Sequence, residues 1–111
     1  MTLKPLKWLA DSLDDLRQFS LDARHEAGYQ LERVQAGKEP EDWKPMPTVG
    51  LGVKEIRVHV DGAYRVLYVA RFSEAVYVLH CFQKKSQKTP KPDIELARNR
   101  FRALIRERKQ Q

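Results

Sequence analysis

The fold is decided by the run Val53-Lys-Glu-Ile-Arg-Val-His-Val, which Asp61-Gly62-Ala63 joins to Tyr64-Arg-Val-Leu-Tyr-Val. Both runs alternate in the manner of half-buried β-strands, and Asp-Gly is a common hairpin turn. These residues therefore predict an antiparallel β-hairpin at the centre of the chain.

The length of the loop decides which side chains share a face of this hairpin. A two-residue loop would pair Val60 with Ala63 and would put Arg57 and Arg65 on opposite faces. A three-residue loop over residues 61–63 makes one face wholly apolar or aromatic, which is the better arrangement for a sheet that covers a core. We therefore predict the three-residue loop, with the pairs Val60 and Tyr64, Val58 and Val66, and Ile56 and Tyr68.

The opposite face of the hairpin would carry Arg57, His59 and Arg65, beside Glu55, Leu67 and Val69. Two guanidinium groups on adjacent strands repel each other unless an anion lies between them. We therefore expect this face to bind an anion, and phosphate is the first candidate.

Size and composition indicate one globular domain. The chain has 111 residues, of which 41% are hydrophobic and 32% charged, enough for a single core without metal or disulfides. Cys81 is the only cysteine, and no apolar run approaches the roughly 20 residues that span a bilayer. The N-terminal residues are interrupted by lysine and proline, so we expect no signal peptide, no membrane association and a cytoplasmic location.

The positive charge is concentrated at the C-terminal end. The whole chain carries +6, and residues 83–111 contain ten Lys or Arg residues against three acidic ones. A concentrated basic surface attracts polyanions, of which nucleic acid is the commonest, although the same charge also suits a solvated helix face.

The remaining elements complete an α+β domain that covers residues 1–111. We predict an N-terminal strand at a sheet edge over Leu3–Leu9, because Pro5 cannot donate a ladder hydrogen bond. A helical hairpin follows, with a short helix to about Gln18 and a second, capped by Ser20, that ends at Gly37. Residues 38–47 are expected to form a loop, residues 76–82 a central strand that completes a three-stranded meander, and the residues after Pro90 a final helix to about Glu107.

Metal and cofactor chemistry find no support in the sequence. His25, His59 and His80 lie on different predicted elements, and Cys81 stands alone, so no ligand cluster has usable spacing. Neither a phosphate-binding glycine loop nor a dinucleotide motif is present. We expect no cofactor, and His80, inside an apolar strand, is expected to be structural.

Lysines of the loop after Phe82 can approach the arginine face. Such cations bind a phosphate and also stabilise the charge that builds on phosphorus during cleavage. RNA supplies its own nucleophile, the 2′-hydroxyl, so an enzyme adds only a proton acceptor, a proton donor and cations. A lysine can accept the proton if neighbouring charges lower its pKa, which the adjacent Lys84 and Lys85 would do.

The run Phe82-Gln-Lys-Lys-Ser-Gln-Lys-Thr-Pro, with the Glu-Ile-Arg segment at residues 55–57 and the Tyr-Arg pair at 64–65, resembles the RelE/ParE toxin superfamily. The closest likeness is to its HigB-like, phage-related branch, and it extends from Leu6 to about Leu104. The resemblance implies a RelE-like fold and the toxin of a type II toxin-antitoxin pair. Many such toxins are metal-independent endoribonucleases that cut messenger RNA on the ribosome.

The resemblance also implies roles for individual residues. Arg57 and Arg65 would contact the scissile phosphate, and Lys84 and Lys85 would hold RNA or move a proton. His59, Lys88, Lys91 and Arg98 would bind RNA. RelE-type nucleases often use a Tyr or His near the C-terminus, and none follows Phe101 here, so the proton-transfer role falls to a lysine or to His59.

The implied partners are messenger RNA, the ribosome and a cognate antitoxin. Such antitoxins often carry a helix-turn-helix domain, so operator DNA would be bound only through the antitoxin. Two other functions remain open, because fold does not determine function. The chain could be a gyrase-inhibiting toxin of the ParE type or a basic module that binds nucleic acid without catalysis.

Overall fold

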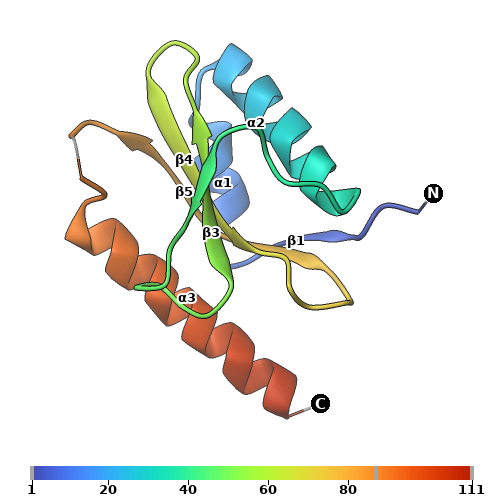
Figure 1. Cartoon of the computed structure of the whole chain (residues 1–111). Coiled ribbons are helices and arrows are strands. Elements are labelled where there is room, and N and C mark those ends of the chain that lie inside the picture. Colours follow the sequence, from blue (N-terminus) through green and yellow to red (C-terminus); the bar gives the residue numbers. More distant parts are fainter. Residues whose placement is uncertain (1, 87, 111) are drawn as a thin grey trace.

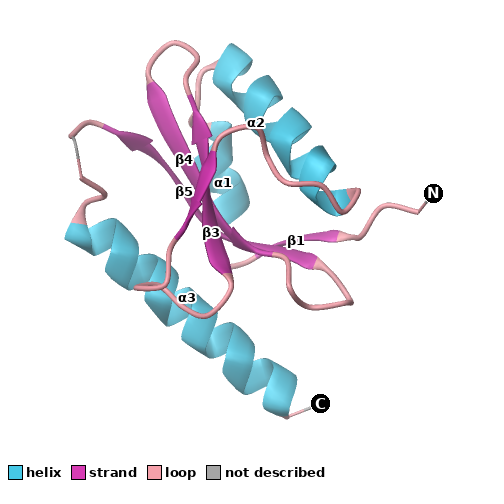
Figure 2. Ribbon diagram, viewed as in Figure 1, coloured by secondary structure: helices cyan, strands magenta, loops and turns pink. Residues whose placement is uncertain are grey.

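A five-stranded sheet with the order β1-β5-β4-β3-β2 forms the middle layer of the protein (Figure 1). The structure is a computed structural model that describes residues 2–86 and 88–110. Helices cover both faces of the sheet, as Figure 2 shows. The elements are β1 (Leu6–Trp8), α1 (Ser12–Arg17), α2 (Leu21–Gln35), β2 (Trp43–Pro45), β3 (Val53–Val58), β4 (Ala63–Val69), β5 (Val76–Lys84) and α3 (Lys91–Lys109).

The helical hairpin agrees with its sequence signals. The Ser20 side chain accepts a hydrogen bond from the Ala23 N–H at 3.2 Å and so caps α2. Gly37 has a φ of 84°. The N–H groups of Gly37 and Lys38 return to the carbonyls of Val34 and Arg33. This pattern is the Schellman ending of a helix, which favours glycine at the left-handed position.

The sheet is mixed rather than a simple meander. β1 lies at the predicted edge, but it pairs in parallel with β5, while the other neighbouring strands are antiparallel. Residues 76–82 of β5 are buried throughout, as their apolar sequence predicts.

The prediction of a loop over residues 38–47 was wrong in part, because Trp43–Pro45 forms strand β2 at the other edge of the sheet. β2 is antiparallel to β3 and places Lys44 beside Glu55. Its proline is tolerated because an edge strand leaves one side of its backbone unpaired. Three residues with one large apolar side chain carry too little periodicity to be recognised as a strand.

The predicted hairpin register was also wrong, by two residues. Val58 pairs with Tyr64 and Ile56 with Val66, and residues 59–62 lie outside the strands. Asp61 and Gly62 both have positive φ, at 56° and 126°, and they close a wider turn than predicted. Because a shift of two residues keeps the alternation of faces, the predicted division of side chains between the two faces is confirmed.

Each face of the sheet has its own apolar core. On one face, α1 and α2 pack over a cluster that includes Leu31, Ile56 and Val66. On the other face, α3 packs through the buried Ala97, Phe101 and Leu104, and the partly buried Ile94 and Ile105 pack beside them. α3 covers only part of its face, and charged side chains of β3, β4 and β5 lie beyond it. In the described part of the chain, no helix is both long and apolar enough to cross a bilayer.

Candidate functional site

Charged side chains gather where β3, β4 and β5 approach the hairpin turn, on the face that also carries α3. Arg57 of β3 lies directly opposite Arg65 of β4. Arg65 in turn pairs with Phe82 of β5, and Ala63 pairs with Lys84. The corrected register therefore brings the two predicted arginines closer together than the register expected from the sequence.

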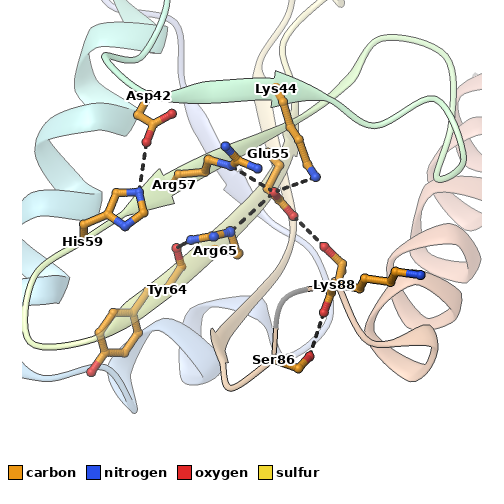
Figure 3. A network of polar contacts seen from close by, with 10 residues as sticks. Asp42, Lys44, Glu55, Arg57, His59, Tyr64, Arg65, Ser86 and Lys88 are labelled. Atoms are coloured by element: carbon orange, nitrogen blue, oxygen red, sulfur yellow. Dashed lines mark hydrogen bonds and ion pairs between the residues drawn. The ribbon is translucent and has the colours of Figure 1, made fainter.

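A buried carboxylate lies between these cations. Glu55 is 0% exposed. Its Oε1 atom is 3.5 Å from Arg65 Nε, 3.8 Å from Arg57 Nε and 3.9 Å from Lys44 Nζ (Figure 3). The anion expected between the arginines is thus supplied by the chain itself, which corrects the prediction that a bound phosphate alone would fill this place. We refer to Lys44, Glu55, Arg57, Arg65 and Lys84 as the cation cluster.

The contacts inside the cation cluster are too long for hydrogen bonds, which join N and O atoms at about 2.7–3.2 Å. Glu55 Oε1, Arg57 Nε and Arg65 Nε are buried atoms without a hydrogen-bond partner among the described residues. The other carboxylate oxygen, Oε2, accepts a hydrogen bond from Thr89 Oγ1 at 3.2 Å. Four cations around one carboxylate leave the cluster net positive, with buried donor groups that are unused.

Arg65 is the most buried residue among the cations of the cluster, with 5% of its surface exposed. Its Nη1 donates to the Tyr64 carbonyl at 2.9 Å, which holds the side chain in place. Burial lowers the pKa of Arg65, and the charge of Glu55 partly opposes this. A guanidinium remains protonated under these conditions, so Arg65 is a fixed positive charge.

Lys84, the last residue of β5, is half-buried. Burial is the largest cause that lowers the pKa of Lys84, followed by the positive charge of Arg65. The positive charges of Lys44 and Arg57 also lower the pKa of Lys84. The charge expected from the sequence to have this effect was that of the adjacent Lys85. Lys85 is exposed and lies beyond the end of the strand.

The other predicted RNA-binding cations lie along a groove rather than in the cluster. This groove, about 430 Å³ in volume, runs between residues 44–48 and the start of α3, and Lys44, Lys88 and Thr89 line it. Lys91 and Arg98 line an adjoining hollow. Arg98 also donates twice to the Thr48 carbonyl, at 3.0 and 2.8 Å, and so ties the residues after β2 to α3. Figure 3 shows the Lys88 side chain directed away from Glu55.

His59 lies at the turn end of the site and is exposed. Its Nε2 atom is 2.9 Å from Asp42 Oδ2, in the residue that precedes β2 (Figure 3). A hollow of about 250 Å³ adjoins this pair, and Arg57 lines it as well. His59 is therefore close to the arginine pair but has a carboxylate partner of its own.

His80 is buried, as its apolar surroundings predict, and joins three elements. Its Nε2 is 2.6 Å from Asp93 Oδ1 of α3, and its Nδ1 is 3.4 Å from Asp15 Oδ2 of α1. Within residues 2–86 and 88–110, no three His, Cys, Asp or Glu side chains gather as a metal-binding group.

Sequence reasoning missed Lys44, Glu55 and Asp42 as members of the site. The alternation of β3 does place Glu55 on the face of Arg57, so its position could have been used to predict an internal counter-ion. Lys44 and Asp42 lie in the stretch that was predicted to be a loop. Their approach to the site depends on the pairing of β2 with β3, which no local signal indicates.

The cation cluster suits an oxyanion with several oxygen atoms. Two guanidinium groups on paired residues supply several N–H donors, and Lys84 adds a point charge from the neighbouring strand. A phosphodiester in this place would gain charge-assisted hydrogen bonds that the long contacts to Glu55 do not provide.

Comparison with protein families gives one match. A family model described as phage-derived protein Gp49-like (DUF891) matches residues 14–102. This range begins in α1, ends in α3 and contains the whole cation cluster. A comparison with curated protein sequences gives no significant match.

Proposed function

The chain belongs to the phage-derived Gp49-like family, and we propose that it is the toxin of a type II toxin-antitoxin pair, an endoribonuclease that cuts messenger RNA on the ribosome in the cytoplasm. The observation that carries this proposal is the net positive cluster of Lys44, Arg57, Arg65 and Lys84 around one buried carboxylate. The resemblance of the 82–90 run to HigB-like toxins supports it, as does the mixed sheet with helices on both faces. We extend the proposal to a RelE-like topology.

In the proposed reaction, the 2′-hydroxyl of one nucleotide attacks the adjacent phosphorus and expels the 5′-oxygen of the next nucleotide. Negative charge builds on the non-bridging oxygens, and Arg57 and Arg65 stabilise it from the sheet face. Their fixed positions matter, because pre-oriented charges do not have to reorganise during the reaction. Glu55 keeps the two guanidinium groups side by side when no substrate is bound.

Lys84 lies on the strand beside Arg65, and we assign it to proton donation to the leaving oxygen. Its lowered pKa makes the ammonium a better acid than a solvated lysine. Lys85, Lys88 and Lys91 are exposed and would hold the RNA backbone beyond the scissile phosphate. Arg98 would assist them where it lines the hollow beside α3.

The proposal includes a partner. A cognate antitoxin with acidic side chains would cover the cation cluster and block access of RNA, because opposite charges steer and hold such complexes. Operator DNA would be bound through the antitoxin rather than through this chain.

The test is to induce the wild-type chain, the Arg57→Ala variant and the Arg102→Ala variant in cells and to map the ends of messenger RNA. Arg57 is one-third exposed, so its removal disturbs the core less than the removal of Arg65 would. Arg102 is an exposed arginine of α3 outside the cluster and is the matched control. We expect Arg57→Ala to reduce cleavage by about 10²-fold, the usual effect of removing one donor to a developing oxyanion, and Arg102→Ala to act like wild type.

Cleavage by a folded Arg57→Ala variant at the wild-type rate would contradict the proposal. Growth arrest with intact messenger RNA and broken DNA would instead identify a gyrase poison. If the wild-type chain causes no growth arrest but binds nucleic acid with a steep dependence on salt, it is a binding module.

A further inference from the structure

The reaction proposed above does not use the contact between His59 and Asp42. The two side chains are 59% and 47% exposed, so a substrate can reach the imidazole. The backbone around Asp42 is fixed, because the Arg57 N–H donates to the Asp42 carbonyl at 2.9 Å. Asp42 is thus attached to the strand that carries one of the two arginines. We propose that His59, oriented by Asp42, is the proton acceptor that activates the 2′-hydroxyl, an assignment that rests on the proposed RNA cleavage.

The pairing of the strands brings the end of β3, which His59 follows, and Lys84 to the same end of the sheet. Ala63 of β4 pairs with Lys84 of β5. His59 follows directly on Val58, the last residue of β3, which pairs with Tyr64 of β4. His59 and Lys84 are thus at the same end of the sheet, at the ends of β3 and β5, and these two strands are separated by β4, a distance of roughly 10 Å.

Ala63, the first residue of β4, pairs with Lys84 and has a short side chain. The arginine pair occupies the next row on the same face, because side chains two residues apart on a strand point the same way. A phosphate held by Arg57 and Arg65 would therefore have the imidazole on one side and the Lys84 ammonium on the other. In-line displacement needs this arrangement, with the proton acceptor and the proton donor on opposite sides of phosphorus.

The Asp42 carboxylate selects the useful form of the imidazole. When Asp42 Oδ2 accepts a hydrogen bond from Nε2–H, the lone pair remains on Nδ1. Nδ1 takes the proton of the 2′-hydroxyl as the new bond from oxygen to phosphorus forms. The bond from phosphorus to the 5′-oxygen breaks, and the Lys84 ammonium donates a proton to that oxygen. The products are a 2′,3′-cyclic phosphate and a 5′-hydroxyl, so atoms and charges balance without a co-reactant.

Several charged groups lie around His59. Asp42 is in direct contact, and Glu41 from the same segment and Glu26 from α2 line the same hollow. Arg57 of β3 lines this hollow as well. A proton acceptor must be neutral to act, so the cleavage rate should fall at low pH and this limb should depend on His59.

The experiment measures single-turnover cleavage of a messenger RNA on purified ribosomes from about pH 6 to about pH 8.5, the range in which a histidine titrates. The variants are His59→Gln and Asp42→Asn, with His25→Gln of α2, an exposed histidine away from the site, as the matched control. We expect His59→Gln to slow cleavage by about 10²-fold to 10⁴-fold and to abolish the low-pH limb. Asp42→Asn should slow cleavage by about tenfold to a hundredfold and shift that limb.

The double variant, His59→Gln with Asp42→Asn, tests whether Asp42 acts only by positioning His59. If Asp42 acts through His59, the double variant is no slower than His59→Gln alone, because the two effects do not add. Amide spectra of each variant that match those of the wild type show that the fold is intact.

A His59→Gln variant with the wild-type rate and pH profile would overturn this assignment while leaving the proposed nuclease in place. A wild-type chain that does not cut RNA would instead remove the proposed function itself.

Discussion

Among the described residues, arginine and glutamate side chains pair at two places, and the geometry of the two differs. Glu74 receives hydrogen bonds from Arg108 at 2.8 and 3.1 Å and from the Tyr77 hydroxyl at 2.9 Å. The Arg108 guanidinium also lies 3.8 Å from the centre of the Phe72 ring. At Glu55, by contrast, three cations share one oxygen atom at 3.5–3.9 Å, and none donates a hydrogen bond to it.

The difference separates a structural ion pair from a binding site. The pair of Glu74 and Arg108 is balanced in charge and close in geometry, so a ligand would have to break good contacts. The cation cluster has excess positive charge, buried donors without partners and a carboxylate that does not satisfy them. A group of like charges of this kind weakens the fold unless it serves to bind an anion.

The largest predicted effect is that of removing the buried carboxylate. Glu55→Gln leaves Arg65 buried without a counter-charge and should lower the free energy of unfolding by about 3 kcal/mol. This value is at the low end for such a change because Lys44 and Arg57 are 40% and 33% exposed and can turn toward water. Glu74→Gln should lower the midpoint much less, because its partner is accessible to solvent. Chemical denaturation of both variants measures the difference.

Equal midpoints for Glu55→Gln and Glu74→Gln would show that the two sites do not differ in energy. A Glu55→Gln variant that is more stable than the wild type would show that the carboxylate is itself the group under strain.

A smaller effect concerns pH. The hydrogen bonds from Arg108 are the largest cause that lowers the pKa of Glu74 from 4.5 to about 2. Because the pKa is lower in the folded state, the stabilisation is fully present above about pH 4.5 and is lost as the pH falls toward 2. The difference in melting temperature between wild type and Glu74→Gln should therefore shrink between about pH 6 and about pH 2.5. A difference that stays constant over this range would mean that Glu74 and Arg108 are not paired in solution.

The sequence predicted the composition of each sheet face because alternation depends only on neighbouring residues. Ile56, Val58 and Tyr64 point to one core, and Arg57 and Arg65 to the other face, whichever even register shift is chosen. The helix ends were also predictable, since Ser20 and Gly37 act through local hydrogen bonds and backbone conformation.

Contacts between distant segments were not predictable in the same way. The exact pairing of Arg57 with Arg65 depends on a turn in which Asp61 and Gly62 both have positive φ. The presence of Lys44 at the site depends on β2, a three-residue strand that forms only because β3 offers it an edge. Glu55 was expected on the arginine face, but the role of its carboxylate as the counter-ion was not predicted.

The most direct test of the account is a titration of the protein with a short RNA that carries 2′-O-methyl groups and so resists cleavage, followed through the arginine Nε–H signals in nuclear magnetic resonance spectra. The signals of Arg57 and Arg65 should shift together, saturate on one binding curve and return at high salt, while the signal of Arg108 stays in place. Binding of the RNA with unchanged Arg57 and Arg65 signals would contradict the claim that the cation cluster receives the phosphate.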